Sequence, residues 1–177
     1  MGKRNYLIEG VSGTGKTSVC NELQRRGYNT INGDRELAYQ GDPGTGKLTD
    51  GLTGESSAIF THAHHIWDVE KVKTLVANKD EAVTFFCGGS RNSAKFIHLF
   101  DGVFVLDVGD LETLNRRIDE RVAVDPTDWG AKPEERELIA QSHQTKEAIP
   151  SSGMAIDATR PLEQVVDEIL RLTQEEF

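Results

Sequence analysis

The residue types best suited to chemistry lie near the amino terminus, in the string Gly10-Val11-Ser12-Gly13-Thr14-Gly15-Lys16-Thr17. This string fits the phosphate-loop pattern G-x-x-x-x-G-K-[ST] at every fixed position. Glycines let successive backbone N–H groups point at one phosphate, while Lys16 reaches the β- and γ-phosphates and Thr17 ligates Mg²⁺. The sequence therefore predicts a site for ATP and Mg²⁺, with the nucleotide held by Gly10, Ser12, Gly13, Thr14, Gly15, Lys16, Thr17 and Ser18.

A second string, Gly41-Asp42-Pro43-Gly44-Thr45-Gly46-Lys47-Leu48, resembles the first but ends in leucine, which cannot ligate magnesium. Asp42 adds an anion where phosphate would bind, and Pro43 removes a backbone donor. We therefore expect no second nucleotide site in this string.

A phosphate loop fixes the nucleotide, so other residues must indicate the reaction. The chain contains no Asn- or Thr-Lys-x-Asp string for reading guanine, and Phe86-Cys87-Gly88 lacks the acidic residue that many ATPases carry there. Both features disfavour a GTPase or a hydrolytic machine. Asp34 is then the best carboxylate to face the γ-phosphate, either as a magnesium ligand or as the base for an attacking hydroxyl, although it could instead cap a helix.

Alternating strands and helices must position these residues. Apolar runs predict strands at residues 5–9, 28–31, 82–87, 102–107 and 154–157. Helical patterns occupy residues 16–25, 57–77, 92–99, 111–122, 133–148 and 161–173. This order is typical of α/β proteins, in which a mostly parallel sheet is covered by helices on both faces and binds ligands at the carboxyl ends of its strands. The 177 residues fit a single domain.

Two polar segments interrupt this order. Residues 36–81 separate the second and third predicted strands by more than one crossover helix, and residues 125–133 form a second polar loop. Long loops are more often functional or mobile than ornamental. We interpret both as insertions over the active edge, with a disordered connector as the alternative for the first.

After the fourth predicted strand, Leu114-Asn115-Arg116-Arg117-Ile118-Asp119-Glu120-Arg121 fits the pattern L-x-x-R-[IL]-x-x-R. This segment resembles the helix that leads into the lid of nucleoside monophosphate kinases and their relatives, the shikimate, gluconate and antibiotic kinases. The resemblance spans nearly the whole core and implies a three-layer fold with five parallel strands in the order 2-3-1-4-5. It also implies that Arg117 lies against adenine, that Arg121 neutralises the transferring phosphate, and that residues 121–133 form a short lid.

The same resemblance implies further nucleotide contacts. Asp157-Ala158-Thr159-Arg160-Pro161 is similar to the adenine-holding loop of the family, so Thr159, Arg160 and Pro161 are expected beside the base. Lys132, at the tip of the expected lid, could close on the nucleotide, although an exposed lysine is usually only solvated.

Two short turns, Gly33-Asp34-Arg35 and Gly88-Gly89-Ser90-Arg91-Asn92, resemble parts of the acceptor-binding region of the family. The resemblance assigns the insertion at residues 36–81 to the same region. The two turns imply an acceptor held by Asp34, Arg35, Gly88, Gly89 and Arg91, with Lys16, Asp34 and Arg121 catalytic. A hydroxyl acceptor needs a base, which Asp34 could supply, whereas a nucleoside monophosphate needs arginines. Two arginines are few for that task, which favours an ATP-dependent kinase acting on a hydroxyl, as shikimate, gluconate and nucleoside kinases do. A nucleoside monophosphate kinase is the alternative, and a non-catalytic ATP-binding sensor is the alternative from another class.

Composition limits the partners. The formal net charge of −9 disfavours nucleic acid and anionic membranes, which leaves the nucleotide and a small acceptor. Cys20 and Cys87 show no metal-ligand spacing and are expected to be reduced, buried thiols. The apolar run near the amino terminus is too short for a signal or membrane segment, which predicts a cytoplasmic protein, as a monomer or homodimer.

Three histidines, His62, His64 and His65, invite a metal site. No cysteine or carboxylate completes a tetrahedral set nearby, so a partly buried helix is the better interpretation. His65 or Trp67 could instead line the acceptor pocket.

Overall fold

Five parallel strands form the central sheet of the computed structural model, which describes residues 4–49, 58–146 and 149–175. In spatial order the strands are β2 (Asn29–Asn32), β5 (Val83–Cys87), β1 (Arg4–Gly10), β6 (Gly102–Asp107) and β7 (Met154–Asp157). Numbered along the chain within this sheet, the order is 2-3-1-4-5, so the predicted α/β fold and strand order are confirmed. Because the strands are parallel, their carboxyl ends meet at one edge of the sheet.

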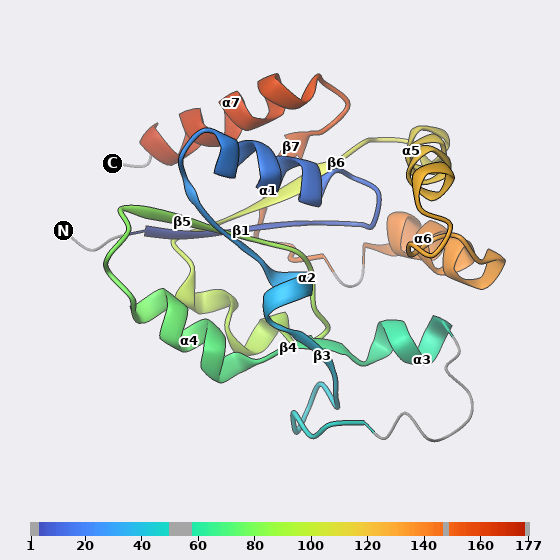
Figure 1. The fold of residues 1–177 in the computed structure, drawn as a ribbon, viewed down its shortest axis with the longest axis horizontal. Helices are drawn as coiled ribbons and strands as arrows, with labels where there is room; N and C mark the ends of the chain where they lie inside the picture. Colours follow the sequence, from blue (N-terminus) through green and yellow to red (C-terminus); the bar gives the residue numbers. More distant parts are fainter. Residues whose placement is uncertain (1–3, 50–57, 147–148, 176–177) are drawn as a thin grey trace.

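Helices cover both faces of this sheet (Figure 1). On one face α1 (Lys16–Arg25) and α7 (Leu162–Glu175) pack against each other. On the other face lie α4 (Val69–Ala77) and two short 3₁₀ helices, η1 (Ser93–Lys95) and η2 (Ile97–Leu99). The protein therefore has the three layers that alternating strands and helices predict.

Alternating side chains of the strands build a core on each face of the sheet. Tyr6 and Ile8 of β1 belong to the core under α1 and α7, whereas Leu7 belongs to the core under α4. Phe85 and Phe86 of β5 alternate in the same way, and the rings of Tyr6 and Phe85 stack with centroids 5.7 Å apart. Burial on both faces fixes the register of the sheet, because a one-residue slip of a strand would move the side chains of each core to the opposite face.

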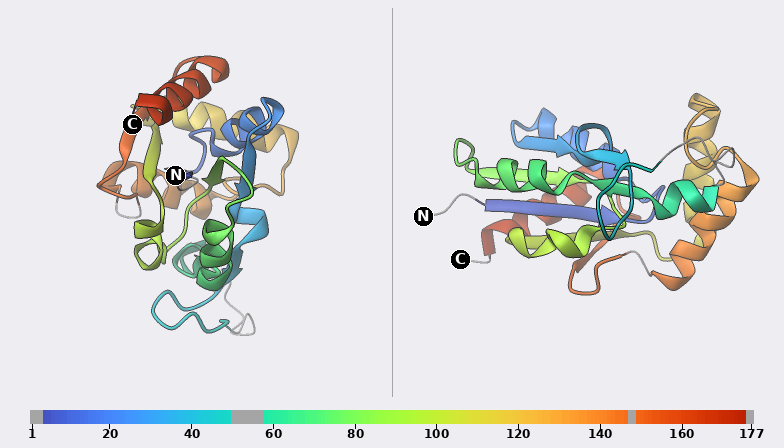
Figure 2. Two further views of the ribbon diagram at one scale, coloured as in Figure 1. Left: turned by 90° about the vertical axis from the view of Figure 1, so that its left-hand side faces the viewer. Right: turned by 90° about the horizontal axis from the view of Figure 1, so that it is seen from below.

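Helices α5 (Leu111–Val124) and α6 (Pro133–Thr145) lie beyond the carboxyl ends of the strands, as the right-hand view of Figure 2 shows. Residues 125–132 connect them, within the segment predicted to be a lid. A third helix, α3 (Ala58–Ala63), packs against α6 from the segment between β2 and β5. These helices surround the edge where a ligand is expected.

The segment between β2 and β5 differs from the prediction of one helix over residues 57–77. It contains α2 (Gly33–Glu36), β3 (Ala38–Gln40) and β4 (His65–Trp67), and β3 pairs with β4 in a separate antiparallel sheet. The continuous helix was wrong, because His65–Trp67 pairs with β3 as the strand β4 and separates α3 from α4. Residues 50–57, at the start of that prediction, lie outside the described part of the chain.

A helix over residues 92–99 was also wrong, since η1 and η2 occupy this segment. The Asn92 side chain accepts from Trp67 N at 3.1 Å and donates to Trp67 O at 3.0 Å, so it is tied to β4. Phe96 and Phe100 are both buried, and the Phe96 ring stacks on Trp67 at 5.5 Å. Two short 3₁₀ turns, which often serve as connectors, make these contacts in place of the predicted helix.

Three further expectations can be compared with the described residues. Cys20 and Cys87 are buried free thiols, as predicted. The carboxylate of Asp42 accepts from the backbone N–H groups of Gly44 and Thr45 at 2.8 and 2.9 Å, so it already occupies the turn of the second glycine-rich string. Helix α6 ends at Thr145, and residues 147–148 of the predicted helix lie outside the described residues.

Within the described residues, no helix combines the length and apolar character needed to cross a membrane.

Candidate active site

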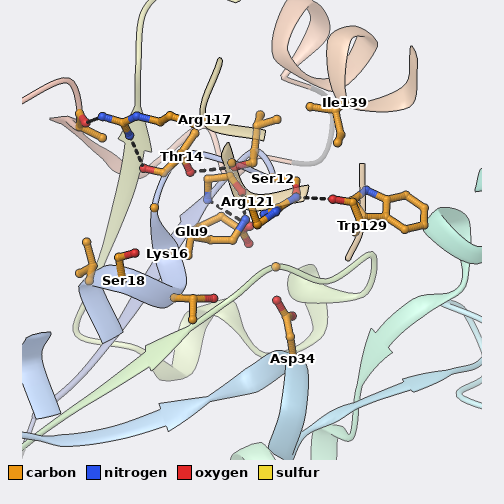
Figure 3. Close-up of a pocket in the computed structure, with 18 of the residues that line it drawn as sticks. Glu9, Ser12, Thr14, Lys16, Ser18, Asp34, Arg117, Arg121, Trp129 and Ile139 are labelled. Atoms are coloured by element: carbon orange, nitrogen blue, oxygen red, sulfur yellow. Dashed lines mark hydrogen bonds between the residues drawn. The ribbon is translucent and has the colours of Figure 1, made fainter. Parts of the chain in front are cut away.

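The glycine-rich loop connects β1 to α1 at the carboxyl edge of the sheet. It forms one wall of a cavity of about 960 Å³ that extends to α2, the 88–92 turn, α5 and α6 (Figure 3). Gly15 has φ 106° and immediately precedes α1, a backbone conformation that favours glycine. The predicted strand–loop–helix arrangement of a phosphate site is present.

Side chains of the loop are held in place. Thr14 is buried, and its hydroxyl donates to Val11 O at 2.7 Å. Lys16 donates from Nζ to Gly10 O, so its ammonium lies over the loop and faces the cavity. Burial lowers the pKa of Lys16, while the carboxylates of Glu9 and Asp34 favour its charged form. The remaining loop positions expected to bind nucleotide also line the cavity, namely Gly10, Ser12, Gly13, Gly15, Thr17 and Ser18.

Glu9, the last residue before the loop glycine, was not among the predicted site residues. It lines the cavity yet is only 1% exposed, and Gly10 N donates to its Oε1 at 3.3 Å. Burial raises the pKa of Glu9 to about 7 from 4.5, against the opposing influence of Lys16, the Gly10 N–H and Arg91. A Cβ on Gly89 would lie 2.3 Å from Glu9 Oε1, so a larger residue in the turn after β5 would displace this carboxylate.

Asp34 lies in α2 across the cavity from the loop. The N-cap of α2 is Asn32, so the interpretation of Asp34 as a helix cap was wrong. His65 Nε2 lies 3.0 Å from Asp34 Oδ1. Burial disfavours ionisation, but the hydrogen bond with His65 and the charge of Lys16 outweigh it and hold the pKa of Asp34 below its ordinary value.

The turn after β5 supplies the other acceptor-side candidates. Arg91 N donates to His65 O at 2.8 Å, and Arg91 Nη1 lies 3.3 Å from His62 Nε2. Arg91, Gly89 and the exposed Arg35 line the cavity. Gly88 does not line it, but a Cβ there would lie 2.8 Å from Asp34 Oδ1, so its place is beside that carboxylate.

Two arginines of α5 reach the loop (Figure 3). Arg117 donates to Thr14 O at 3.2 Å and to Ala158 O at 2.5 Å, and thereby connects the loop to the segment after β7. Arg121 donates to Ser12 Oγ at 3.0 Å and to Trp129 O at 2.5 Å, and thereby connects the loop to the segment between α5 and α6. Both guanidinium groups therefore lie beside the glycine-rich loop.

No protein-family model and no curated protein sequence matches this chain. Solved structures are similar to it over nearly the whole length. A shikimate kinase from Bacteroides thetaiotaomicron is 16% identical with a TM-score of 0.61, and the match covers 97% of this chain and 98% of that chain. A sugar kinase from Janibacter sp. HTCC2649 is 20% identical, with a TM-score of 0.56 and coverage of 98% and 96%. A gluconokinase from Sinorhizobium meliloti 1021 is 18% identical, with a TM-score of 0.53 and coverage of 97% and 94%.

The fold is that of the P-loop small-molecule kinases. In this P-loop kinase fold, the segment after β7 carries the predicted adenine loop. Its Arg160 lines the cavity, whereas Thr159 and Pro161 do not, and Asp157 Oδ1 accepts from Thr159 N at 3.0 Å. Lys132 lies outside the cavity wall as the exposed N-cap of α6.

The oxygen donors in this cavity suit Mg²⁺ better than a metal that needs several His or Cys ligands. Among the described residues, no group of three or more His, Cys, Asp or Glu side chains could hold a metal ion. Thr17 and Asp34, the two predicted magnesium ligands, both line the cavity. A hydroxyl and a carboxylate are hard oxygen donors, and Mg²⁺ is usually bound by one or two protein groups together with water and substrate phosphates. These residues therefore fit Mg²⁺.

Proposed function

We propose that the protein is an ATP-dependent kinase that transfers the γ-phosphoryl group to a hydroxyl of a small-molecule acceptor. The observation that carries this proposal is the placement of Lys16 and Asp34 on opposite walls of one cavity, close enough for the charge of Lys16 to lower the pKa of Asp34. A phosphate-binding lysine facing an ionised carboxylate is what phosphoryl transfer to a hydroxyl requires.

Positive side chains gather around the cavity although the whole chain carries a net charge of −9. Glu9, Asp34, Glu120 and Asp128 are the acidic groups in its wall. The cationic groups are Lys16, Arg35, Arg91, Arg117, Arg121 and Arg160. This local excess of positive charge favours a polyphosphate in a cavity of an otherwise acidic protein.

In the proposed reaction Asp34 accepts the proton of the acceptor hydroxyl. The oxygen forms a bond to the γ-phosphorus, the bond from that phosphorus to the bridging oxygen breaks, and ADP leaves with the electron pair. Lys16 and Arg121 neutralise charge on the transferring group, while the loop N–H groups hold the β-phosphate. Thr17 would hold Mg²⁺, which would supply further charge neutralisation, and Asp34 would be a second ligand of the ion in the alternative in which it is not the base.

Two observations bear on the acceptor. The similar solved structures are described as sugar, shikimate and gluconate kinases, which favours a hydroxyl-bearing metabolite. The acceptor half of the cavity is the part lined by Asp34, Arg35, Gly89 and Arg91. Its two arginines keep a nucleoside monophosphate as the second candidate. His62 lies beside the guanidinium of Arg91, leaving Arg35 as the more exposed cation for such a phosphate.

ADP release from ATP-Mg²⁺ tests the proposal across a panel of sugars, sugar acids, shikimate, nucleosides, nucleoside monophosphates and hydroxyl-bearing antibiotics. The Lys16→Ala protein is the blank. Release that one hydroxyl acceptor stimulates, and that the blank lacks, supports the kinase. Stimulation by a nucleoside monophosphate alone supports the second candidate, and bound ATP with a flat panel supports a sensor.

A further inference from the structure

Two histidines of the segment between β3 and α4 contact Asp34 and Arg91, which are charged groups of the acceptor half. His62 lies in the last turn of α3, and His65 is the first residue of β4. His65 Nε2 is 3.0 Å from Asp34 Oδ1, and His62 Nε2 is 3.3 Å from Arg91 Nη1. Both imidazoles line the cavity.

We infer that His65 and His62 are positioning residues, His65 orienting the Asp34 carboxylate and His62 aiming the Arg91 guanidinium, so that the segment from α3 to β4 completes the acceptor site. This inference rests on the proposed function. It also assigns the histidines a use other than metal binding, in agreement with the absence of a metal cluster among the described residues.

The backbone strengthens the arrangement. Arg91 N donates to His65 O at 2.8 Å, so the residue that contacts Asp34 through its ring also holds the turn that carries Arg91. β4 itself is fixed by pairing with β3 and by the buried side chains of Ile66 and Trp67. His65, the first residue of β4, therefore contacts both Asp34 and the turn that carries Arg91.

The chemistry of the two contacts is different. A guanidinium only donates, so Nε2 of His62 must accept, which requires a neutral ring protonated at Nδ1. Burial, followed by the charges of Arg91, His65 and Lys16, lowers the pKa of His62 to about 4, consistent with a neutral ring. A carboxylate only accepts, so Nε2 of His65 must carry the proton. The two rings, three residues apart, are therefore expected to be protonated at different nitrogens.

His64 provides a matched control from the same segment. His64 directly follows α3, and its Nδ1 lies 2.8 Å from the carbonyl oxygen of Phe60 in that helix. The rings of His64 and Phe60 stack with centroids 4.0 Å apart. His64 is not part of the cavity wall. Removing this imidazole therefore perturbs the same local structure without touching Asp34 or Arg91.

Steady-state kinetics with the acceptor found in the panel give the first test. His65→Ala should lower kcat about 10-fold or more with little change in acceptor KM, because it frees the base. His62→Ala should raise acceptor KM by a similar factor with little change in kcat, because it frees the binding cation. His65→Gln and His62→Gln should restore part of each loss, since glutamine can donate and accept, while His64→Ala should behave as wild type.

Imidazole ¹⁵N shifts of the whole protein at pH 7 give a second test that needs no activity. We expect His62 as the neutral Nδ1–H form and His65 protonated at Nε2. A wild-type protein with no kinase activity but with these two forms would overturn the proposed function and keep the positioning arrangement. Activity with equal effects of all three alanine variants, or a His62 ring protonated at Nε2, would overturn the positioning roles.

Discussion

Glu9 and Asp34 are carboxylates of the same cavity whose pKa values move in opposite directions. Burial dominates at Glu9 and raises its pKa, whereas at Asp34 the hydrogen bond with His65 and the charge of Lys16 outweigh burial. Pairs of this kind often divide the acid and base roles of a site. In the proposed reaction Asp34 is then the ionised group that accepts the hydroxyl proton, whereas Glu9 is a group that changes charge near neutral pH.

The raised pKa of Glu9 makes stability depend on pH. Between 4.5 and about 7 the folded protein keeps a proton on Glu9 that the unfolded chain has released, so the free energy of unfolding falls as pH rises through this window. Glu9→Gln removes this dependence. We expect the variant to gain about 2–3 kcal/mol relative to wild type between pH 5 and pH 8.

Urea unfolding at several pH values checks this result. Glu137→Gln, an exposed position in α6, is the control and should show no such gain. A constant difference between Glu9→Gln and wild type at all pH values would contradict the raised pKa.

Residues that belong to a sequence motif could be predicted. Residues whose role depends on a contact with a distant part of the chain could not. Lys16 and Thr17 follow from the loop pattern, and Asp34 from its place after the second strand. Glu9 could have been noticed as a carboxylate in an otherwise apolar strand. The contacts of His62 and His65 lie 29 and 31 residues away in the sequence, so no local pattern contains them.

At the scale of elements, strands with continuous apolar runs were predicted well because burial on both faces leaves a clear signal. The segment from α3 to η2 was not, because its conformation depends on tertiary contacts. Ile66 and Trp67 are buried by β3 and by Phe96, and the 92–99 turn is held by Asn92. The helical periodicity of this segment did not predict its structure, because tertiary packing overrode the local preference for helix.

Asn92→Ala should therefore destabilise the protein by about 2–3 kcal/mol. The substitution removes two hydrogen bonds to Trp67 and leaves the buried N–H and C=O of that residue unsatisfied. Asn78→Ala, which removes an exposed side chain that accepts from Asp80 N, should cost well under that amount. Thermal unfolding of both variants tests this prediction. Equal losses of stability would show that Asn92 does not hold β4.

At the scale of the whole molecule, one cavity collects groups from β1, α2, the 88–92 turn, α5 and the segment after β7. This convergence follows from parallel strands whose carboxyl ends share an edge. The fold and the location of this cavity could therefore be predicted from element order. The acceptor could not, because its half of the cavity is built by the segment whose structure the sequence did not reveal.

Nucleotide binding should stabilise the whole protein. At ATP-Mg²⁺ concentrations near 100 times Kd, binding to the folded state alone adds about 2.7 kcal/mol to the free energy of unfolding. The corresponding rise in Tm should be largely lost in Lys16→Ala, which removes the cation over the loop. An equal rise in wild type and variant would place the nucleotide elsewhere.

Transfer of label from γ-labelled ATP to the acceptor, compared between wild type and Asp34→Asn, tests the central claim most directly. We predict label on the acceptor with wild type, a loss of about 100-fold or more with Asp34→Asn, and ATP affinity close to the wild-type value. A parallel fall in ATP-Mg²⁺ affinity would assign Asp34 chiefly to the metal. Label released only to water, or equal transfer by both proteins, would contradict a kinase in which Asp34 activates the acceptor.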